Sequence, residues 1–438
     1  MADYLPNTKS EQSEMLKTLG LEKLEDLFSH LPEAVRLNRP LHLPEGLCEM
    51  ENKAQIEALS KKNKVYDTCF LGAGAYRHFI PSVVSGVASR AEFVTGYTPY
   101  QAEISQGVLQ SIFEYQTMMC TLTGLDVSNA SVYDGATALA EGVMMCVNQK
   151  KNTVLVSEAI NPEYMRVLKT WCTYCEVELK TLPIKAYVTD LDDLSESITE
   201  DVGAVVLQSP NFFGSFEDME KASGIIHEKG ALFVASVNPI SLAVCACPGD
   251  YGADVAVGEG QPLGNALGGG GPYLGFMTAT KKLMRKLPGR IVGQTLDNQG
   301  RRAFVLTLQA REQHIRREKA ASNICSNQAL NALTAAVYLS AMGPQGLGEV
   351  VESCMVSAHT LRDKMAKTRG VTVFEQDFFH EFVVEIDADE KVLEKALTEN
   401  GILGGYPLGN GRYIYCATEL IDETKMDKLC GILAEVTR

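Results

Sequence analysis

Long apolar runs and an excess of positive charge are both missing from this sequence. No run approaches the roughly 20 apolar residues that a membrane-spanning helix needs, and the segment from Met1 to Gly20 is polar, unlike a signal peptide. The chain has 40 Lys and Arg against 55 Asp and Glu, for a formal net charge of -15, whereas nucleic acids and anionic membranes bind basic surfaces. We therefore expect a cytoplasmic protein that binds neither nucleic acid nor a membrane.

Cysteine pairs with the spacing of a zinc site are also scarce. The 12 cysteines are scattered, with one CxxC at Cys172 and Cys175 and one CxC at Cys245 and Cys247. A structural zinc site usually needs two such pairs, and the CxxC straddles the end of a predicted helix and the start of a strand. We expect structural thiols and no metal; a metal or redox role is the alternative.

A lysine is absent from a segment that resembles the lysine-bearing segment of certain enzymes. Residues 253–277 read as an apolar strand, a loop, and a four-glycine turn (268–271) before a second strand. In doubly wound enzymes that use pyridoxal phosphate (PLP), such a strand and loop carry the lysine that binds the cofactor as a Schiff base. No lysine occurs between Lys229 and Lys281. Without a primary amine no imine forms, so we expect no covalent PLP on this chain.

The sequence pattern changes twice along the chain, which predicts three parts. At 438 residues the chain exceeds the roughly 250–300 residues at which a single core stops growing. Residues 1–65 are polar and helical and predict an N-terminal arm. Residues 66–330 have an α/β pattern, and residues 331–438 predict a small α+β domain of two strands and two helices after a long helix.

Apolar runs of strand length alternate with helical stretches in the middle part. The predicted strands are 153–157, 203–210, 231–237, 253–258 and 273–279, and the clearest helices are 162–172 and 216–230. Strands that are apolar throughout favour a mainly parallel sheet with helices on both faces. Such sheets bind ligands at the carboxyl ends of their strands.

Two loops concentrate polar and aromatic side chains. In residues 70–81, glycines would let backbone amides approach an anion, although a tight turn with a polar rim explains the composition equally well. In residues 95–107, tyrosines flank a proline beside a carboxylate, which suits an interface or a ligand site, although tyrosines also serve to pack a loop onto a core. The candidate residues of the two loops are Tyr76, Arg77, His78, Tyr97, Tyr100, Glu103, Ser105 and Gln106.

Two further segments have a functional and a structural interpretation. Residues 134–142 begin a predicted helix at the place where a PLP enzyme of this fold would bind phosphate on backbone amides. Asp134 at that turn would repel a phosphate dianion. Residues 311–328 are basic and polar, which is typical of a solvated helix face or of a partner surface.

Four long motifs together resemble glycine decarboxylase (P-protein) of the glycine cleavage system, in the α-subunit type of the split bacterial form. The motifs are FLGAGAYRHFIP (70–81), YTPYQAEISQG (97–107), GNALGGGGPYLGF (264–276) and REQHIRREKAASNICSNQAL (311–330). They occur in order, and the likeness covers nearly the whole chain. The resemblance implies an α/β fold of the PLP-dependent transferase type (fold type I), with an N-terminal helical arm and a small C-terminal domain.

The resemblance also accounts for the missing lysine. In this family the second, related subunit carries the PLP lysine in a His–Lys pair ahead of its own glycine-rich turn. Counting back from Gly268 puts Gln261 at the lysine position and Gly260 at the histidine position. The family's aspartate for the pyridine nitrogen stands three residues before an asparagine, and with Asn238 as that asparagine the position holds Ala235. The resemblance thus implies that PLP is held by the partner subunit.

The activity that the resemblance implies is decarboxylation of glycine with transfer of the aminomethyl group to the lipoyl arm of H-protein. An α2β2 assembly with the PLP-bearing subunit follows from the same likeness, with this chain inactive alone. We expect the two loops to line a cleft shared with that subunit. The alternatives are a purely structural or regulatory scaffold, and an independent PLP enzyme using Lys281 or Lys282. Both lysines follow the four-glycine turn, where the geometry is wrong for the cofactor.

An acidic chain that binds an acidic H-protein would need a local basic patch. The candidates are Arg285, Lys286, Arg290 and the run 311–319.

Overall fold

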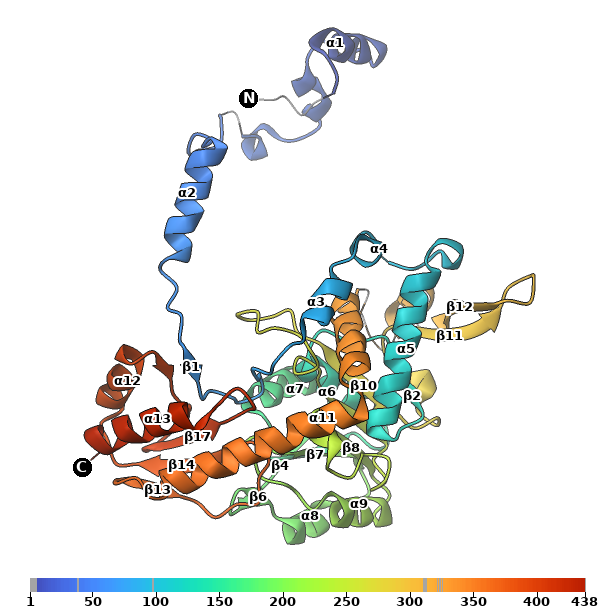
Figure 1. Ribbon diagram of the computed structural model, residues 1–438. Coiled ribbons are helices and arrows are strands. Elements are labelled where there is room, and N and C mark those ends of the chain that lie inside the picture. The colour runs from blue at the N-terminus through green and yellow to red at the C-terminus, as the bar shows by residue number, and fades with distance from the viewer. Residues whose placement is uncertain are drawn as a thin grey trace. The chain divides into compact units, whose positions relative to one another are not determined.

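A seven-stranded sheet organises the larger of two units in the computed structural model of this chain (Figure 1). The structure describes residues 6–37, 39–96, 98–309, 313–320, 322, 324 and 326–437. The units comprise residues 1–64 and 65–438. None of the described helices is both long enough and apolar enough to span a bilayer.

The N-terminal unit is a chain of short helices with no core of its own. Its helices are α1 (Lys9–Thr18), η1 (Leu24–Phe28), η2 (Glu33–Val35) and α2 (Glu49–Ser60). The α1 helix begins at a capping box, in which Thr8 and Glu11 satisfy each other's backbone N–H groups. None of the described residues of this arm is buried, so tertiary packing within the unit contributes little stability.

The central sheet is mainly parallel, as expected. Its strands are β2 (Val127–Ser128), β3 (Thr153–Ser157), β4 (Glu178–Leu182), β7 (Val202–Ser209), β8 (Leu232–Val237), β9 (Val255–Glu259) and β10 (Gly275–Ala279). They are ordered β2-β10-β9-β8-β7-β3-β4. The five strands from β9 to β4 run parallel, and β10 is antiparallel to both of its neighbours. The carboxyl ends of β7, β8 and β9 therefore meet at one edge.

Helices cover both faces of this sheet. The helices of residues 65–328 are α3 (Ser82–Ala88), α4 (Ala91–Val94), η3 (Ala102–Ile104), α5 (Gln106–Thr123), α6 (Gly135–Cys146), α7 (Pro162–Tyr174), α8 (Leu191–Ser197), α9 (Met219–Glu228), η4 (Ser241–Ala243), η5 (Met284–Lys286), α10 (Gln313–Arg316) and η7 (Arg317–Lys319). On β8, Val234 packs with α6 and α7, whereas Phe233 and Ala235 pack with α5 and α9 on the opposite face. Burying a side chain such as Phe233 contributes about 2 kcal/mol.

The sequence did not indicate several short pairings in the larger unit. Two hairpins join β5 (Ile184–Lys185) to β6 (Val188–Thr189) and β11 (Ile291–Leu296) to β12 (Arg302–Thr307). Near the start of this unit, β1 (Thr68–Cys69) pairs in parallel with β15 (Ile402–Leu403), which ties the two ends of the unit together.

A second sheet follows a long helix near the C-terminus. The helix α11 (Ala329–Met365) is broken by a non-helical Gly343 with φ 62°. The sheet has the order β13 (Val371–Val373), β14 (Glu381–Ile386), β17 (Arg412–Cys416) and β16 (Tyr406–Gly409). The helices α12 (Glu390–Glu399) and α13 (Glu423–Val436) pack with α11 around a separate apolar cluster. The sheet has four strands where the sequence pattern predicted two. The pattern missed β13 because it is very short, and β16 because it contains proline and glycine.

Deleting residues 1–64 should leave the thermal unfolding midpoint of the remaining chain unchanged, because no described side chain in the arm is buried. Circular dichroism melts measure this directly. As a control, Phe233→Ala in the same truncated chain should lower its free energy of unfolding by about 3–5 kcal/mol. A truncated chain that unfolds well below the full chain would contradict this account of the arm.

Candidate functional site

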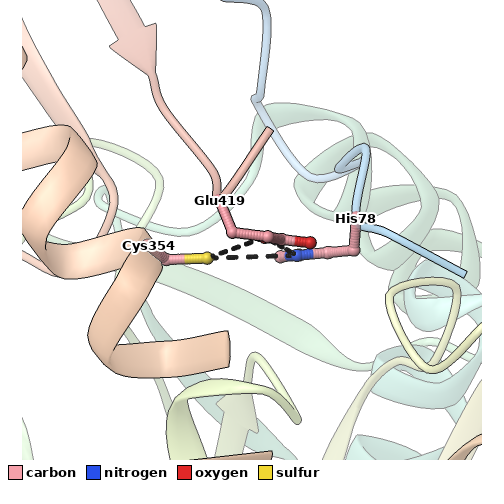
Figure 2. Close-up of side chains that lie close together, drawn as sticks. All are labelled: His78, Cys354 and Glu419. Carbon is pink, nitrogen blue, oxygen red and sulfur yellow. Dashed lines mark hydrogen bonds and ion pairs between the residues drawn. The ribbon is translucent and has the colours of Figure 1, made fainter. Parts of the chain in front are cut away.

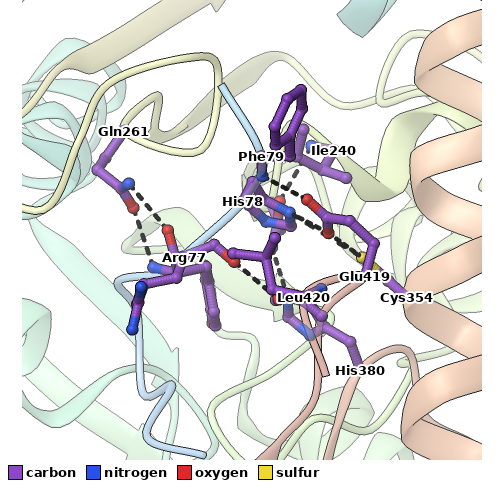
Figure 3. A network of polar contacts seen from close by, with 12 residues as sticks. Arg77, His78, Phe79, Ile240, Gln261, Cys354, His380, Glu419 and Leu420 are labelled. Atoms are coloured by element: carbon purple, nitrogen blue, oxygen red, sulfur yellow. Dashed lines mark hydrogen bonds and ion pairs between the residues drawn. The ribbon is translucent and has the colours of Figure 1, made fainter. Parts of the chain in front are cut away.

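Gln261, at the expected lysine position, holds the loop 70–81 in place. Its side chain is 2% exposed and lies just beyond the carboxyl end of β9. The amide oxygen accepts from the Tyr76 N–H at 2.9 Å, and the amide nitrogen donates to the Tyr76 carbonyl at 2.9 Å and to the Asn265 carbonyl at 2.7 Å. Figure 3 shows Gln261 facing the loop that carries Arg77. Both ends of the amide are therefore used internally.

Two carboxyl side chains occupy the N-terminus of α6. Glu259 accepts from the Gly135 N–H at 3.0 Å through one oxygen, and from Gln261 at 3.0 Å and Leu274 at 2.8 Å through the other. Burial raises the pKa of Glu259 to about 7, against the effect of these three donors. The side chain of Asp134 caps the helix by accepting from the Thr137 N–H at 2.7 Å. The helix start that the sequence predicted is confirmed, and its anion-binding groups have internal partners.

Little space remains beside Glu259 and Tyr76, although a larger cavity borders Ser209 and Val237 at the ends of β7 and β8. A cavity of about 30 Å³ is bordered by Tyr76, Ser236 and Glu259, among others. That volume accommodates about one water molecule, whereas ligand sites usually measure roughly 300–1,000 Å³. The start of α6 is equally crowded, since a Cβ on Gly135 would lie 2.2 Å from the Tyr164 hydroxyl. Ala235, at the expected aspartate position, is fully buried in the core on β8.

Glu381 on β14 binds the same loop from the second sheet. It is 2% exposed and accepts from the Ala73 N–H at 2.6 Å and from the Tyr76 hydroxyl at 2.7 Å. Burial raises the pKa of Glu381 to about 7, although both hydrogen bonds act in the opposite direction. Asn161 completes this contact by donating to the Ala73 carbonyl at 3.2 Å.

A second carboxylate, Glu419, connects the loop to α11. One oxygen of Glu419 lies 2.9 Å from His78 Nδ1 and accepts from the Cys354 thiol at 3.1 Å (Figure 2). The other oxygen accepts from the Phe79 N–H at 2.6 Å. Ligand-type atoms of His78, Cys354 and Glu419 lie within 4.8 Å of one another. Burial raises the pKa of the Cys354 thiol strongly, so the thiol is protonated and donates to Glu419. The arrangement is that of a hydrogen-bonded cluster.

Of the candidates in the loop 70–81, the structure leaves only Arg77 facing solvent. Tyr76 and His78 are engaged by Glu381 and Glu419. The Arg77 side chain is exposed, while its carbonyl accepts from the Thr418 hydroxyl at 2.7 Å. Tyr76 and His78 therefore act in positioning the loop.

The second loop lies against β12 and borders a different cavity. Tyr97 lies outside the described residues, and the described Glu103 is exposed. Tyr100 is 55% exposed, and its hydroxyl accepts from Arg290 at 2.9 Å. Gln106 pairs with both backbone groups of Phe304 on β12, at 2.8 and 2.9 Å, so it holds the hairpin.

Ser105 stands directly before α5 and makes no capping hydrogen bond with its side chain. The loops line separate cavities, with Tyr76 at one and residues 98 and 99 at the other. The exposed candidates are therefore Arg77 in the first loop and Tyr100 and Glu103 in the second.

The expectation that Arg290 belongs to an exposed basic patch was wrong. Arg290 is 7% exposed, because it is packed at the base of the hairpin between β11 and β12. Arg285 and Lys286 are exposed, and the Lys286 amine donates to the Met145 carbonyl at 2.7 Å.

The sequence interpretation missed the buried carboxyl groups of Glu259 and Glu381 and the partly buried Glu419. Glu259 did carry a signal, since it is an acidic residue at the end of an apolar strand and only two positions before Gln261. Glu381 and Glu419 had none, because their partners in the loop 70–81 lie more than 300 residues earlier in the chain.

The fold is that of PLP-dependent enzymes of fold type I. A sphingosine-1-phosphate lyase from Burkholderia pseudomallei superposes with a TM-score of 0.67 at 12% sequence identity, over 92% of this chain and 94% of the lyase. A C-DES variant with glycine covalently linked to its PLP gives a TM-score of 0.63 at 13% identity, over 88% of this chain and 99% of C-DES. At these identities the likeness concerns the fold alone.

Closer similarities define the family. The profile described as "Glycine cleavage system P-protein" matches residues 2–433. A protein of Moorella thermoacetica named "Probable glycine dehydrogenase (decarboxylating) subunit 1" is 51% identical over 98% of this chain and 100% of its own length. A protein of the same name from Carboxydothermus hydrogenoformans is 49% identical over 98% of this chain and 99% of its own length. The crystal structure of an inhibitor-bound glycine decarboxylase (P-protein) gives a TM-score of 0.92 at 46% identity, over 99% of this chain and 100% of that one. The chain belongs to the glycine cleavage system P-protein family.

The raised pKa of Glu381 predicts a pH-dependent loss of stability. Because its folded-state pKa of about 7 lies above the ordinary value of 4.5, ionisation is less favourable in the folded chain. The contribution to stability is complete below about pH 4.5 and is lost as the pH rises through 7. Relative to Glu381→Gln, the wild type should lose on the order of 2 kcal/mol of unfolding free energy between about pH 5 and 8, measured by urea titrations. If the unfolding free energies of the wild type and Glu381→Gln changed equally with pH, the raised pKa of Glu381 would be contradicted.

Proposed function

We propose that this chain is the cofactor-free subunit of a two-subunit glycine dehydrogenase (decarboxylating). With a PLP-bearing partner it would decarboxylate glycine, release CO2 and pass the aminomethyl group to the lipoyl arm of H-protein. The observation that supports this most strongly is Gln261, whose amide holds the loop 70–81 at the position where the enzyme fold needs a lysine.

The residues at the carboxyl ends of β8 and β9 do not fit PLP. An amide such as that of Gln261 is not nucleophilic and forms no Schiff base. Glu259 and Asp134 use the backbone donors that a phosphate would need, and Ala235 offers no charge to a pyridine nitrogen. The cavity beside Glu259 and Tyr76 measures only about 30 Å³, which is too small for the cofactor in this arrangement of side chains. PLP, which stabilises the carbanion left by decarboxylation, therefore belongs on a partner chain.

The relatives' designation as "subunit 1" supports a second subunit of the same enzyme. The arm adds a physical reason for a partner, because large apolar side chains are exposed along it. They include Phe28 at 49%, Leu43 at 70% and Met50 at 77% exposed. We propose an α2β2 assembly in which this chain lines a shared cleft with Arg77, Tyr100 and Glu103 and excludes water from the reaction.

The geometry argues against an independent PLP enzyme. Since β10 is antiparallel to β9, with Ala279 opposite Val255, Lys281 and Lys282 follow β10 at the sheet edge opposite to Gln261. Neither amine can reach the position that a cofactor lysine would take. A scaffold that adds nothing to the cleft remains the rival reading, and it is distinguished by substitutions at Tyr100 and Glu103.

Glycine–bicarbonate exchange in the presence of lipoylated H-protein should require both subunits. The chain alone and the PLP-bearing subunit alone should be inactive, and the mixture active. Tyr100→Phe and Glu103→Gln should each lower kcat/KM of the mixture by at least roughly tenfold, the scale of one lost hydrogen bond to a charged group. Glu114→Gln, at another exposed carboxylate, is the matched control. Unchanged kinetics in both loop variants would mean that this chain is only a scaffold for the catalytic subunit. Exchange activity of the isolated chain would refute the proposal.

Restoring the lysine should not restore the cofactor. Neither Gln261→Lys nor Ala235→Asp/Gln261→Lys changes Glu259, which occupies the Gly135 N–H beside the small cavity in the wild-type chain. Incubation with PLP should therefore give neither a Schiff-base absorption band nor label after borohydride reduction, whereas the PLP-bearing subunit gives both. A reducible band in either variant would show that the site still accepts the cofactor.

A further inference from the structure

A second cavity lies at the N-terminus of α11, apart from the filled site at Gln261. Its volume is about 350 Å³, which is within the usual range for a ligand site of roughly 300–1,000 Å³. It is bordered by Thr98 and Pro99 of the second loop, by Pro272 after the four-glycine turn, by Arg290, and by residues 326–331. Segments far apart in the sequence therefore meet around one space.

Arg290 contributes a buried positive charge to this cavity. It is 7% exposed, and within the described parts of the chain no carboxylate lies at ion-pairing distance from it. One terminal nitrogen donates to the Tyr100 hydroxyl at 2.9 Å, and the guanidinium lies 5.0 Å from the centre of the Tyr100 ring. Its Nε is buried without a hydrogen-bond partner. A buried guanidinium without a counter-ion is unfavourable, so an anion at this place would stabilise it.

The start of α11 contributes a second, independent source of positive potential. Gln328 stands at the N-cap position and makes no capping hydrogen bond with its side chain. The first turn, at Ala329, Leu330 and Asn331, borders the same cavity. The N–H groups of a first turn have no intrahelical acceptor and carry the positive end of the helix dipole. The helix runs regularly to Gly343, which is long enough for this effect.

We propose that this cavity binds a small oxyanion, a carboxylate or a phosphate, between the Arg290 guanidinium and the N-terminus of α11. Both groups match the chemistry: arginine pairs with oxyanions through two parallel N–H bonds, and uncapped helix N-termini bind anions with backbone N–H groups. Tyr100 orients the guanidinium and is a positioning residue.

The position of the cavity suggests where the anion comes from, and this step rests on the proposed function. Thr98 and Pro99 belong to the loop that we propose lines the cleft shared with the PLP-bearing subunit. In that assembly two oxyanions are at hand, the carboxylate of glycine and the phosphate of PLP. The cavity is also tied to the Gln261 region, since Asn265 donates to the Asn331 carbonyl at 3.4 Å and Asn331 donates to the Tyr273 carbonyl at 2.7 Å.

Anion binding can be tested first on the isolated full chain. Inorganic phosphate or acetate, titrated at constant ionic strength against chloride, should raise the thermal unfolding midpoint in a saturable way. Arg290→Gln should abolish this stabilisation, and Arg290→Lys should weaken it because lysine lacks the planar fork. Arg285→Gln, which removes an exposed positive charge nearby, should leave it intact. No saturable stabilisation of the wild type, or equal stabilisation of Arg290→Gln, would overturn the proposal.

Kinetics of the reconstituted pair then identify the source of the anion. If the cavity receives the glycine carboxylate, Arg290→Lys should raise KM for glycine by about tenfold or more at unchanged PLP affinity. If it receives the cofactor phosphate, PLP affinity should fall instead. If neither KM for glycine nor PLP affinity changes, the cavity binds only free anions, and its assignment to the shared cleft is wrong. A wild-type pair without exchange activity would refute the proposed function, while phosphate binding by the isolated chain would still stand.

Discussion

The pairing of the Gln261 amide with both backbone groups of Tyr76 is the contact on which the rest of the site depends. It fixes the loop 70–81 at the carboxyl end of β9, and from there Glu381 and Glu419 attach the same loop to the second sheet and to α11. A neutral, hydrogen-bonding side chain suits this role, because its donor and acceptor both find backbone partners without burying a charge.

Two regions of the larger unit differ in electrostatic character. One contains carboxyl groups, and the other contains a buried guanidinium. Around β9 and α6, Glu259 and Asp134 use the local N–H donors, so this region is closed to further anions. At the start of α11, Arg290 and an uncapped helix leave donors without a described acceptor. The chain thus has the fold of PLP enzymes with the N–H donors at Gly135 and Thr137 used internally, while the proposed anion site lies near the loop proposed to meet the partner.

Buried parallel strands were the most predictable part of the fold. The strand β3 was predicted at its observed bounds, because strands covered on both faces are apolar throughout. The continuation of α11 beyond Gly343 and Pro344 was not foreseen, since this dipeptide normally ends a helix. In the site, the assignment of Gln261 to the lysine position remains a prediction from the sequence, and its hydrogen bonds to Tyr76 were not foreseen. The roles of Tyr76 and Glu381 depend on a contact across 305 positions, and local patterns carry no information on such contacts.

The central claim is that the chain's own side chains replace the cofactor, and equilibrium dialysis of PLP against the isolated Arg290→Gln chain, which lacks the proposed anion site, tests it most directly. The account predicts no saturable binding at PLP concentrations that fill the PLP-bearing subunit. Stoichiometric binding of PLP to this variant would mean that Glu259 and Gln261 leave their positions when the cofactor is present, and would contradict the claim.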